Sequence, residues 1–209
     1  MVAFTPTYPL TIPTTPGFSH SNIRLAKSIG ITTSIFTFQS QVQQFDGEVW
    51  TGEFKLPPMI RSQAGQWQAF FMQLRGRRGT FRLGDPDNTS LLGAATGTIR
   101  VNGASQVGNQ VALDGFANST TDVFKKGDYI QINSYMYLVT DDASSNGSGE
   151  ADVKIEPALR QSIETISDNT IITYGSSAKT VWRMDDNTLG WDGDRVSRYG
   201  FNFSCTEAL

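Results

Sequence analysis

The chain of 209 residues is long enough for one large or two small domains, each with its own hydrophobic core. Charged residues make up 18% and hydrophobic residues 38%, both below the usual share, and Thr, Ser, Asn, Gln and 20 glycines replace them. This composition is typical of strands, turns and polar surfaces that face other protein. The net charge of -3 and the isoelectric point near 5.1 exclude a global positive field for nucleic acid or an anionic membrane.

The ends and the cysteine content restrict the cellular context. Cys205 is the only cysteine, which excludes a disulfide within the chain and a cysteine-based metal site. Residues 1–18 lack the basic start and the apolar run of a signal peptide, and no stretch approaches the roughly 18 apolar residues of a membrane span. We therefore expect a soluble protein that is made in a cytoplasm and does not insert into a membrane.

The N-terminal segment, residues 1–18, carries prolines at positions 6, 9, 13 and 16 between Thr, Tyr, Leu and Ile. Proline at this density forbids a helix and a central strand, because it removes backbone donors and fixes the chain angle. The segment is therefore predicted to be an extended arm that lies over a surface with its apolar residues in a groove.

Residues 31–56 predict a long antiparallel hairpin. Residues 31–45, ITTSIFTFQSQVQQF, and 48–56, EVWTGEFKL, are rich in β-branched and aromatic residues that alternate with polar ones. Asp46-Gly47 between them is a typical hairpin turn. On the first strand the alternation predicts an apolar face and a glutamine face, namely Phe36, Phe38 and Val42 against Gln39, Gln41 and Gln43.

A single amphipathic helix is predicted after Pro57-Pro58, which end the second strand. Its apolar residues recur every three or four positions and share one face, which we expect to pack on the hairpin: Ile60, Ala64, Trp67, Phe70, Phe71 and Leu74. Gly76 falls where a left-handed C-terminal cap is expected, and nearby arginines suit the negative end of the helix dipole. Residues 79–83 then form a strand, which Gly84-Asp85-Pro86 closes.

Residues 92–160 differ in composition, with frequent Gly and Asn and fewer aromatic residues. Five short strands at regular spacing predict a small barrel of the OB or SH3 type, at residues 98–101, 110–113, 128–132, 135–140 and 151–155. Residues 141–150, DDASSNGSGE, predict a polar surface loop.

After Pro157 the chain regains the composition of its first ninety residues, with strand-like segments at residues 171–174, 180–184 and 199–205. These segments need a sheet to join, and the hairpin with its helix is the nearest one. The predicted fold class is therefore mainly β. A discontinuous β domain comprises residues 1–90 and 166–209, and a small barrel of residues 91–165 is inserted into it.

The residues that could support catalysis are few. His20 is the only histidine, and nothing around Ser19 or Ser21 resembles a nucleophile elbow. The carboxylates of Asp185-Asp186 and Asp192-Gly193-Asp194 lie in turn-like stretches, where Asp bonds its own backbone. No segment has the ligand pattern of an EF-hand. We therefore expect no enzyme activity, no catalytic residue, no metal site and no cofactor.

The arginine cluster Arg75, Arg77 and Arg78 has no phosphate-binding context, because the chain lacks both a P-loop and a dinucleotide fingerprint. An acidic chain with one such cluster makes a poor nucleic-acid footprint. Pairing with carboxylates, within the chain or on a neighbouring subunit, is the commoner use of arginine.

Several segments together resemble the distal tail proteins of long-tailed bacteriophages, which sit between the tail tube and the tail tip. The resemblance begins at FTPTYPLTIPTTPG, continues through FTFQSQVQQFDGEVWTGEFKLPPM and is most specific at WQAFFMQLRGRRGTFRLGDPD. It then runs through FKKGDYIQIN and IEPALR to YGFNFSCTEAL, so it covers essentially the whole chain.

The resemblance implies a virion protein of the tail tip that forms a closed, hexameric ring around a channel for DNA. The split domain would be a tail-tube-like β domain that forms the ring, and the OB-like barrel would project outward. The tail tube protein and the hub or baseplate proteins would be partners. In this setting Arg75, Arg77 and Arg78 are candidate inter-subunit contacts that pair with a neighbour's acids. The residues predicted to build the central joint of the scaffold are Trp50, Pro57, Pro58, Trp67, Phe70, Gly76, Gly79, Gly84, Asp85 and Pro86.

Three alternatives stay open. The inserted barrel could be a carbohydrate or host-surface binding module, which its polar loop at residues 141–150 favours, although clustered exposed aromatics for sugar stacking are missing. The chain could be the tail tube protein itself, which would polymerise into long tubes. A tail-associated hydrolase is the third, and it lacks a catalytic constellation.

Overall fold

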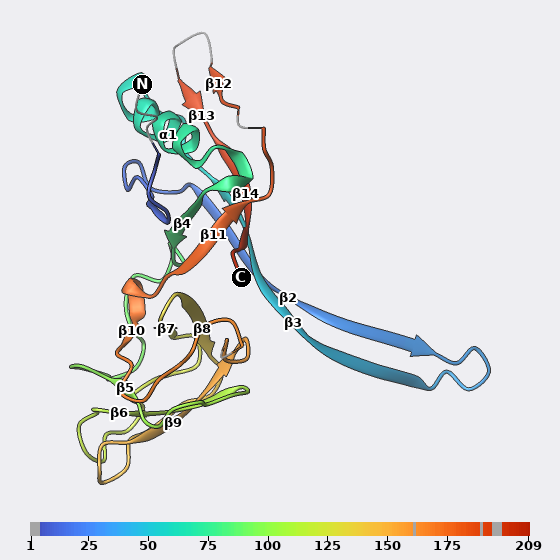
Figure 1. Cartoon of the computed structure of the whole chain (residues 1–209), viewed down its shortest axis with the longest axis vertical. Coiled ribbons are helices and arrows are strands. Elements are labelled where there is room, and N and C mark those ends of the chain that lie inside the picture. Colours follow the sequence, from blue (N-terminus) through green and yellow to red (C-terminus); the bar gives the residue numbers. More distant parts are fainter. Residues whose placement is uncertain (1–4, 161, 189, 194–197) are drawn as a thin grey trace.

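The computed structural model describes residues 5–160, 162–188, 190–193 and 198–209. These residues form two β bodies stacked along the long axis, and a hairpin projects sideways from between them (Figure 1). One α-helix, α1 (Arg61–Leu74), and two 3-10 turns, η1 (Gly76–Arg78) and η2 (Gly175–Ser177), complete the described part of the chain. The prediction of a mainly β fold with one helix and a small barrel is confirmed.

The first body is a six-stranded sheet in the order β1-β4-β11-β14-β3-β2, so strands from both ends of the chain lie side by side. The pairing is antiparallel except between β1 and β4. In chain order these strands are β1 (Leu10–Thr11), β2 (His20–Thr33), β3 (Ser40–Lys55), β4 (Thr80–Leu83), β11 (Thr180–Met184) and β14 (Asn202–Glu207). A small pair, β12 (Asp192–Gly193) and β13 (Tyr199–Gly200), lies beside it.

Helix α1 packs its predicted apolar face into the core of this sheet, because the 3.6-residue repeat aligns Ala64, Trp67, Phe70, Phe71 and Leu74, which are all buried. Ile60 does not share this face, since it is the N-cap residue and stays half exposed. The left-handed cap also comes one residue sooner than predicted: Arg75 adopts it with φ 53°, and Gly76 follows with φ 66°.

The second body is a nearly closed six-stranded sheet in the order β10-β7-β8-β9-β6-β5. A bridge between Arg100 and Ile171 connects its two ends. Its strands are β5 (Arg100–Val101), β6 (Gln110–Asp114), β7 (Tyr129–Ile132), β8 (Tyr135–Val139), β9 (Ala151–Glu156) and β10 (Ile172–Tyr174). The positions of β5 to β9 match the predicted strands within two residues, because each combines local alternation with a turn signal.

The return of the chain to the first sheet comes later than predicted. Ile166 and Ile172 belong to the barrel core, and β10 pairs with β7 instead of joining the hairpin. The physical reason is that the barrel needs β10 to close its cylinder, and β11 is the first strand after it that joins the first sheet. The predicted end of the barrel at residue 165 is therefore too early, because the barrel sheet extends through β10 to Tyr174.

The hairpin has a different turn from the predicted one. Strands β2 and β3 pair from His20 with Lys55 out to Thr33 with Ser40, and residues 34–39 form the turn. Asp46-Gly47 lies inside β3, opposite the register shift between Lys27 and Ile29, where it forms a bulge instead of a turn. Phe36 and Phe38 accordingly lie in the turn and not on a strand face, so their predicted placement is wrong.

The N-terminal segment is extended, as predicted. Its strand β1 pairs with β4 at one edge of the first sheet, and Leu10, Ile12 and Phe18 are partly buried against the core. The Tyr8 hydroxyl donates to the Gln73 carbonyl at 2.8 Å, which fastens the segment to the end of α1.

Candidate functional site: the projecting arm and the crevice at its base

The outer part of the hairpin, residues 28–45, forms what we call the distal arm. It contains no charged residue, although a chain with 18% charged residues would carry about three in such a stretch. Strand β14 pairs with β3 only between Thr51 and Lys55, inside the first body. Among the described residues, therefore, no strand pairs with either outer edge of the arm. An isolated two-stranded ribbon is only marginally stable in water, and unpaired edges without charges are templates for another strand.

The register gives the two faces of the distal arm distinct characters. Ile29 faces the same side as Gln44, and the next pair on that side is Ile31 with Val42. All three apolar side chains are exposed. The opposite side carries uncharged polar groups and a glycine: Gly30, Thr32, Gln41 and Gln43. The predicted separation of Val42 from the glutamines is thus confirmed for Gln41 and Gln43.

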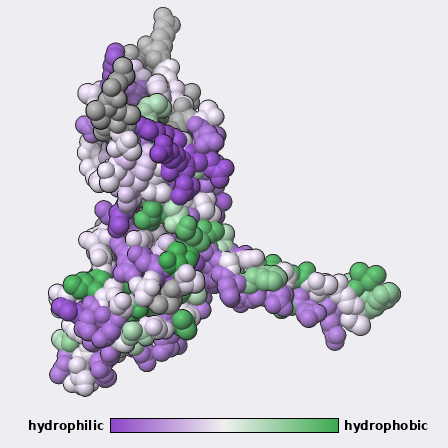
Figure 2. Space-filling model, in the orientation of Figure 1, coloured by the Kyte–Doolittle hydropathy of each residue, from purple (hydrophilic) through white to green (hydrophobic). Residues whose placement is uncertain are grey.

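The tip of the arm is its most apolar part. Ser34 holds the turn, because its carbonyl accepts the Phe38 N–H at 2.9 Å and its hydroxyl accepts the N–H groups of Phe36 and Thr37 at 3.3 Å. With the backbone fastened in this way, the apolar side chains point outward: Phe36 is 88% exposed, Phe38 82% and Ile35 79%. Figure 2 shows this hydrophobic group at the end of the arm.

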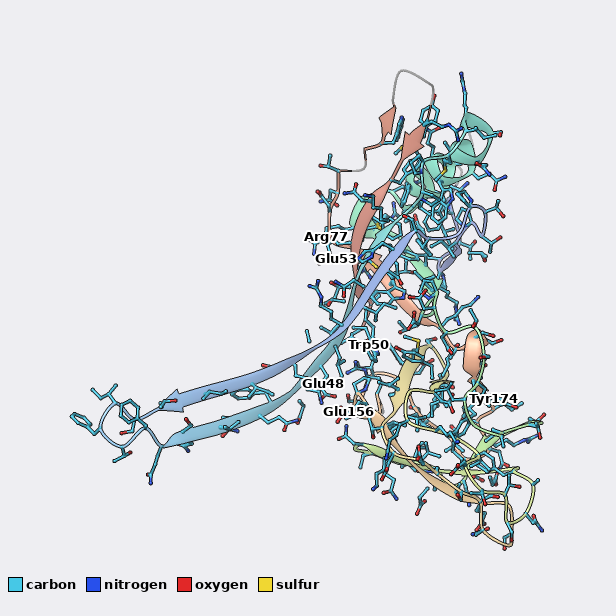
Figure 3. All side chains as sticks on the ribbon, turned by 180° about the vertical axis from the view of Figure 1, so that it is seen from behind. Glu48, Trp50, Glu53, Arg77, Glu156 and Tyr174 are labelled. Carbon is cyan, nitrogen blue, oxygen red and sulfur yellow. The ribbon has the colours of Figure 1, made fainter. Side chains whose placement is uncertain are left out.

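Two linked groups of polar residues fix the base of the arm to the barrel. In the first, the Lys27 ammonium bridges Glu48 at 2.9 Å and Glu156 at 2.6 Å, and the Ala158 N–H donates to Glu48 at 2.8 Å. Figure 3 shows Glu48 and Glu156 at the level where the arm leaves the body. Burial works against ionisation of Glu48, but the Ala158 N–H and Lys27 outweigh it and lower the pKa of this carboxyl.

The second group is buried. The Arg160 guanidinium contacts the Glu207 carboxylate at 2.8 Å. This carboxylate also accepts hydrogen bonds from the Thr180 hydroxyl at 2.8 Å and from the Trp50 backbone N–H at 3.2 Å. Burial raises the pKa of Glu207 above its ordinary value, while Arg160 and the two hydrogen bonds act in the opposite direction. Because Arg160 comes from the barrel side and Glu207 from β14, this pair connects the two bodies.

Trp50, a predicted joint residue, lies between the two bodies (Figure 3). Its indole N–H donates to the Met136 carbonyl of β8 at 3.0 Å, and its ring lies 6.4 Å from that of Tyr129. It is buried in the core of the first body. One tryptophan therefore contacts both bodies at the level where the arm begins.

A crevice of about 460 Å³ lies between the base of the arm and the barrel. Its exposed apolar residues are Phe45, Val107, Ile163 and Leu209, and its more deeply buried members are Glu48 and Arg160. Both buried groups are already paired, with Lys27 and Glu207 respectively. The crevice is thus an apolar-rimmed hollow built from stretches that are far apart in the sequence, and Figure 2 shows hydrophobic groups near the root of the arm.

The arginine-glycine segment makes a tight corner. The Arg183 guanidinium donates to the Arg77 carbonyl at 2.8 Å, and the Asn187 side chain accepts the Arg77 N–H at 3.1 Å. A Cβ at Gly79 would lie 2.5 Å from Tyr8 and 2.6 Å from the Leu74 carbonyl, so only glycine fits there. The corner residues therefore satisfy one another's backbone groups.

The side chains of the arginines at this corner, Arg75, Arg77 and Arg78, are exposed. Within the described part of the chain, no ion pair involves Arg77 or Arg78. Their pairing with a neighbouring subunit stays a prediction.

The other predicted joint residues lie along the first body. Pro57 and Pro58 separate β3 from α1, and Trp67 and Phe70 lie in its core. A Cβ at Gly84 would lie 2.2 Å from the Ala178 carbonyl, which makes this a close approach of the two connections to the barrel. Asp85 and Pro86 line a hollow between the N-terminal segment and this connection.

Among the described residues, the polar side chains considered for catalysis do not form a constellation. His20 is exposed and lines a hollow with Glu53, Lys55 and Asp186. Asp186 accepts the Thr188 N–H at 2.8 Å, as predicted for an aspartate in a turn, and Asp185 accepts the Thr206 hydroxyl. The Asp192 side chain and Asp194 lie outside the described residues. No group of three or more His, Cys, Asp or Glu with metal-binding geometry occurs among those that are described.

In the described residues no helix is both long and apolar enough to cross a membrane. No protein-family model matches the chain, and a search of curated proteins finds no match. The resemblance to distal tail proteins therefore stays a prediction, and the surfaces described above are the basis for a functional proposal.

Proposed function

We propose that the protein is a structural component of a phage tail tip that assembles into a closed ring, hexameric by the resemblance, with a central channel for DNA. The observation that carries this proposal is the distal arm: an uncharged, exposed ribbon with two unpaired edges and an apolar face. A free monomer would expose this ribbon to water at a cost in stability, whereas an assembly would cover it.

A ring is the assembly that such an asymmetric projection favours. When an arm on one side of a subunit contacts a different surface of the next copy, the contacts run head to tail and close into a ring if the rotation permits. The partners proposed at the two faces of the ring are the tail tube protein and the hub or baseplate proteins. The virion tail tip is the proposed location.

The polar face of the arm suits a channel. Thr32, Gln41 and Gln43 offer hydroxyl and amide groups without charge, so a DNA duplex passing them would meet neither strong attraction nor repulsion. The apolar face, with Ile29, Ile31 and Val42, would then contact protein. In this arrangement the arginines at residues 75–78 lie away from the lumen, and finding them on the bore of a particle would contradict it.

Native mass spectrometry and negative-stain imaging of the purified chain test the proposal. We expect a closed ring, with a mass of about 137 kDa for six copies of 22.9 kDa. A matched variant replaces residues 31–42 by Asn-Gly, which joins Gly30 to its partner Gln43 through a two-residue turn. This variant should keep the circular dichroism of the parent and lose the ring. Long tubes would favour the tail tube protein instead, and a monomer even in the presence of tail tube protein would contradict the proposal.

A further inference from the structure

The tip of the arm and the crevice at its base have matching chemistry. The tip residues, 34–39, contain no charged group, and the crevice offers an apolar rim whose residues stay exposed in the monomer, with Val107 at 71%. Two other hollows of comparable volume have four titratable side chains each in their linings. One carries His20, Glu53, Lys55 and Asp186, and the other carries Arg82, Asp85, Asp87 and Lys179. The crevice has three charged residues, Asp46, Glu48 and Arg160, but Glu48 and Arg160 are buried and paired. Asp46 is thus the one exposed charged side chain among the described residues of its rim, and the crevice is the better receptor for an uncharged apolar tip.

The amount of exposed apolar surface on the arm is that of an interface. Leaving out Phe45, which lines the crevice, six of its apolar side chains are exposed, namely Ile29, Ile31, Ile35, Phe36, Phe38 and Val42. With full side-chain areas of about 160–250 Å², their exposed fractions amount to an area on the order of 800 Å². The largest patch on a typical monomer is roughly 300–600 Å², and a standard interface buries about 800 Å² per partner. An area of this size fits a contact with another protein chain.

The tip cannot fill the crevice of its own chain. Phe45, on the crevice rim, belongs to β3, and five paired positions from Ile29 to Thr33 carry the tip about 17 Å away from this rim. A paired ribbon cannot fold back onto its own root without breaking its ladder. The tip that enters a given crevice therefore comes from another copy.

We propose that the apolar tip of one copy inserts into the crevice at the arm base of the next copy, so that Phe36 and Phe38 contact Val107 and Ile163. This inference rests on the proposed ring and specifies its contact. The inserted barrel, which supplies Val107 and Ile163, then forms half of each subunit contact instead of only projecting outward. Insertion brings in no charge, and the charged groups Glu48 and Arg160 keep their partners Lys27 and Glu207.

The crevice rim also holds a polar group that the tip can satisfy. Asp46 lies on the rim and can accept a hydrogen bond from a tip hydroxyl such as that of Thr37. The proposed contact is therefore apolar at its centre and polar at its edge, as protein interfaces are.

Cysteine cross-linking between two singly substituted chains tests the contact. Phe36→Cys and Val107→Cys chains are mixed, disassembled, reassembled and treated with a short bismaleimide. The native Cys205 is buried and burial raises its pKa, so it should not react. We expect a cross-linked pair in the mixture and at most traces with either chain alone. The matched control pairs Phe36→Cys with Leu92→Cys, another exposed apolar position on the barrel side.

Aspartate variants give an independent readout. Phe36→Asp or Val107→Asp should raise the concentration for half-assembly at least tenfold, because a buried aromatic or valine contributes about 1.5–3 kcal/mol and about 1.4 kcal/mol equals tenfold. Both positions are exposed in the monomer, so folding should persist. Leu92→Asp should leave assembly unchanged. A ring that forms normally with Phe36→Asp, or that cross-links Phe36→Cys only to itself, overturns the tip contact while the ring proposal stands. A wild-type chain that never assembles overturns both.

Discussion

Replacing Arg160 by methionine should weaken the connection between the two bodies. In the native protein its guanidinium lies 2.8 Å from the buried Glu207 carboxylate. The variant leaves that carboxylate with two donors, the Thr180 hydroxyl at 2.8 Å and the Trp50 N–H at 3.2 Å. Removing one member of a buried pair generally costs about 3–5 kcal/mol, because the remaining charge is left without compensation. We expect a loss of this size in the free energy of unfolding at about pH 8.

The loss should depend on pH in a defined direction. Burial already raises the pKa of Glu207 in the folded state, and removal of the cation raises it further. A carboxyl with a raised folded-state pKa is most favourable below its unfolded value of 4.5 and loses this advantage as the pH rises through the folded-state pKa. The difference between the Arg160→Met variant and the wild type should therefore shrink as the pH is lowered from about 8 to about 5.

Urea denaturation followed by tryptophan fluorescence provides the assay, at several protein concentrations because assembly adds to apparent stability. The double variant Arg160→Met/Glu207→Gln removes the unpaired charge and keeps one acceptor oxygen, for either the Thr180 hydroxyl or the Trp50 backbone N–H. It should recover at least about 1 kcal/mol relative to the single variant. A single variant within about 1 kcal/mol of wild type at the higher pH, or a loss equal at both pH values, would refute this account of the junction.

Three further predictions concern the joint and its charges. Trp50→Phe should cost about 1–2 kcal/mol, because it removes the N–H bond to Met136 and leaves a buried carbonyl unsatisfied; thermal unfolding with an unchanged midpoint would contradict this. Gly79→Ala should destabilise the chain by about 1 kcal/mol or more, because its Cβ would meet Tyr8 and Leu74. Gly65→Ala, at an open position of α1, should stabilise the chain by about 0.5–1 kcal/mol. Equal effects of the two substitutions in urea denaturation would argue against the tight corner at Gly79. Glu48 has a lowered pKa, so its contribution should be present at neutral pH and be lost as the pH falls below about 4.5, and Glu48→Gln should flatten the acid limb of a stability–pH curve.

The fold could be read from the sequence where the signals are local. Strands β6 and β11 lie where alternation and turn residues predict them, and the buried face of α1 follows its 3.6-residue repeat. Asp46-Gly47 misled the prediction, because the same dipeptide serves a turn or a bulge and the choice depends on the strand opposite. The strand β2 also gave a signal that the prediction missed, since Ile23 and Leu25 alternate with polar residues and are partly buried.

The residues of the crevice could not be predicted from sequence patterns, because they are brought together only by the fold. The crevice brings Phe45 of the hairpin together with Val107 and Ile163 of the barrel region, and no spacing rule connects three such distant positions. Its polar neighbour, the pair of Arg160 and Glu207, likewise depends on how the two bodies pack. The uncharged run at residues 28–45 was visible in the sequence. Only the structure shows that these residues form a two-stranded ribbon whose outer edges have no paired strand among the described residues.

A single-particle electron-microscopy structure of the assembled protein tests the central claim most directly, because it locates every arm relative to the neighbouring copy. We predict a closed ring in which each distal arm is covered, with Phe36 of one copy against Val107 and Ile163 of the next. A ring in which the arms extend freely into solvent, or an assembly held by other surfaces with the crevice empty, would contradict it.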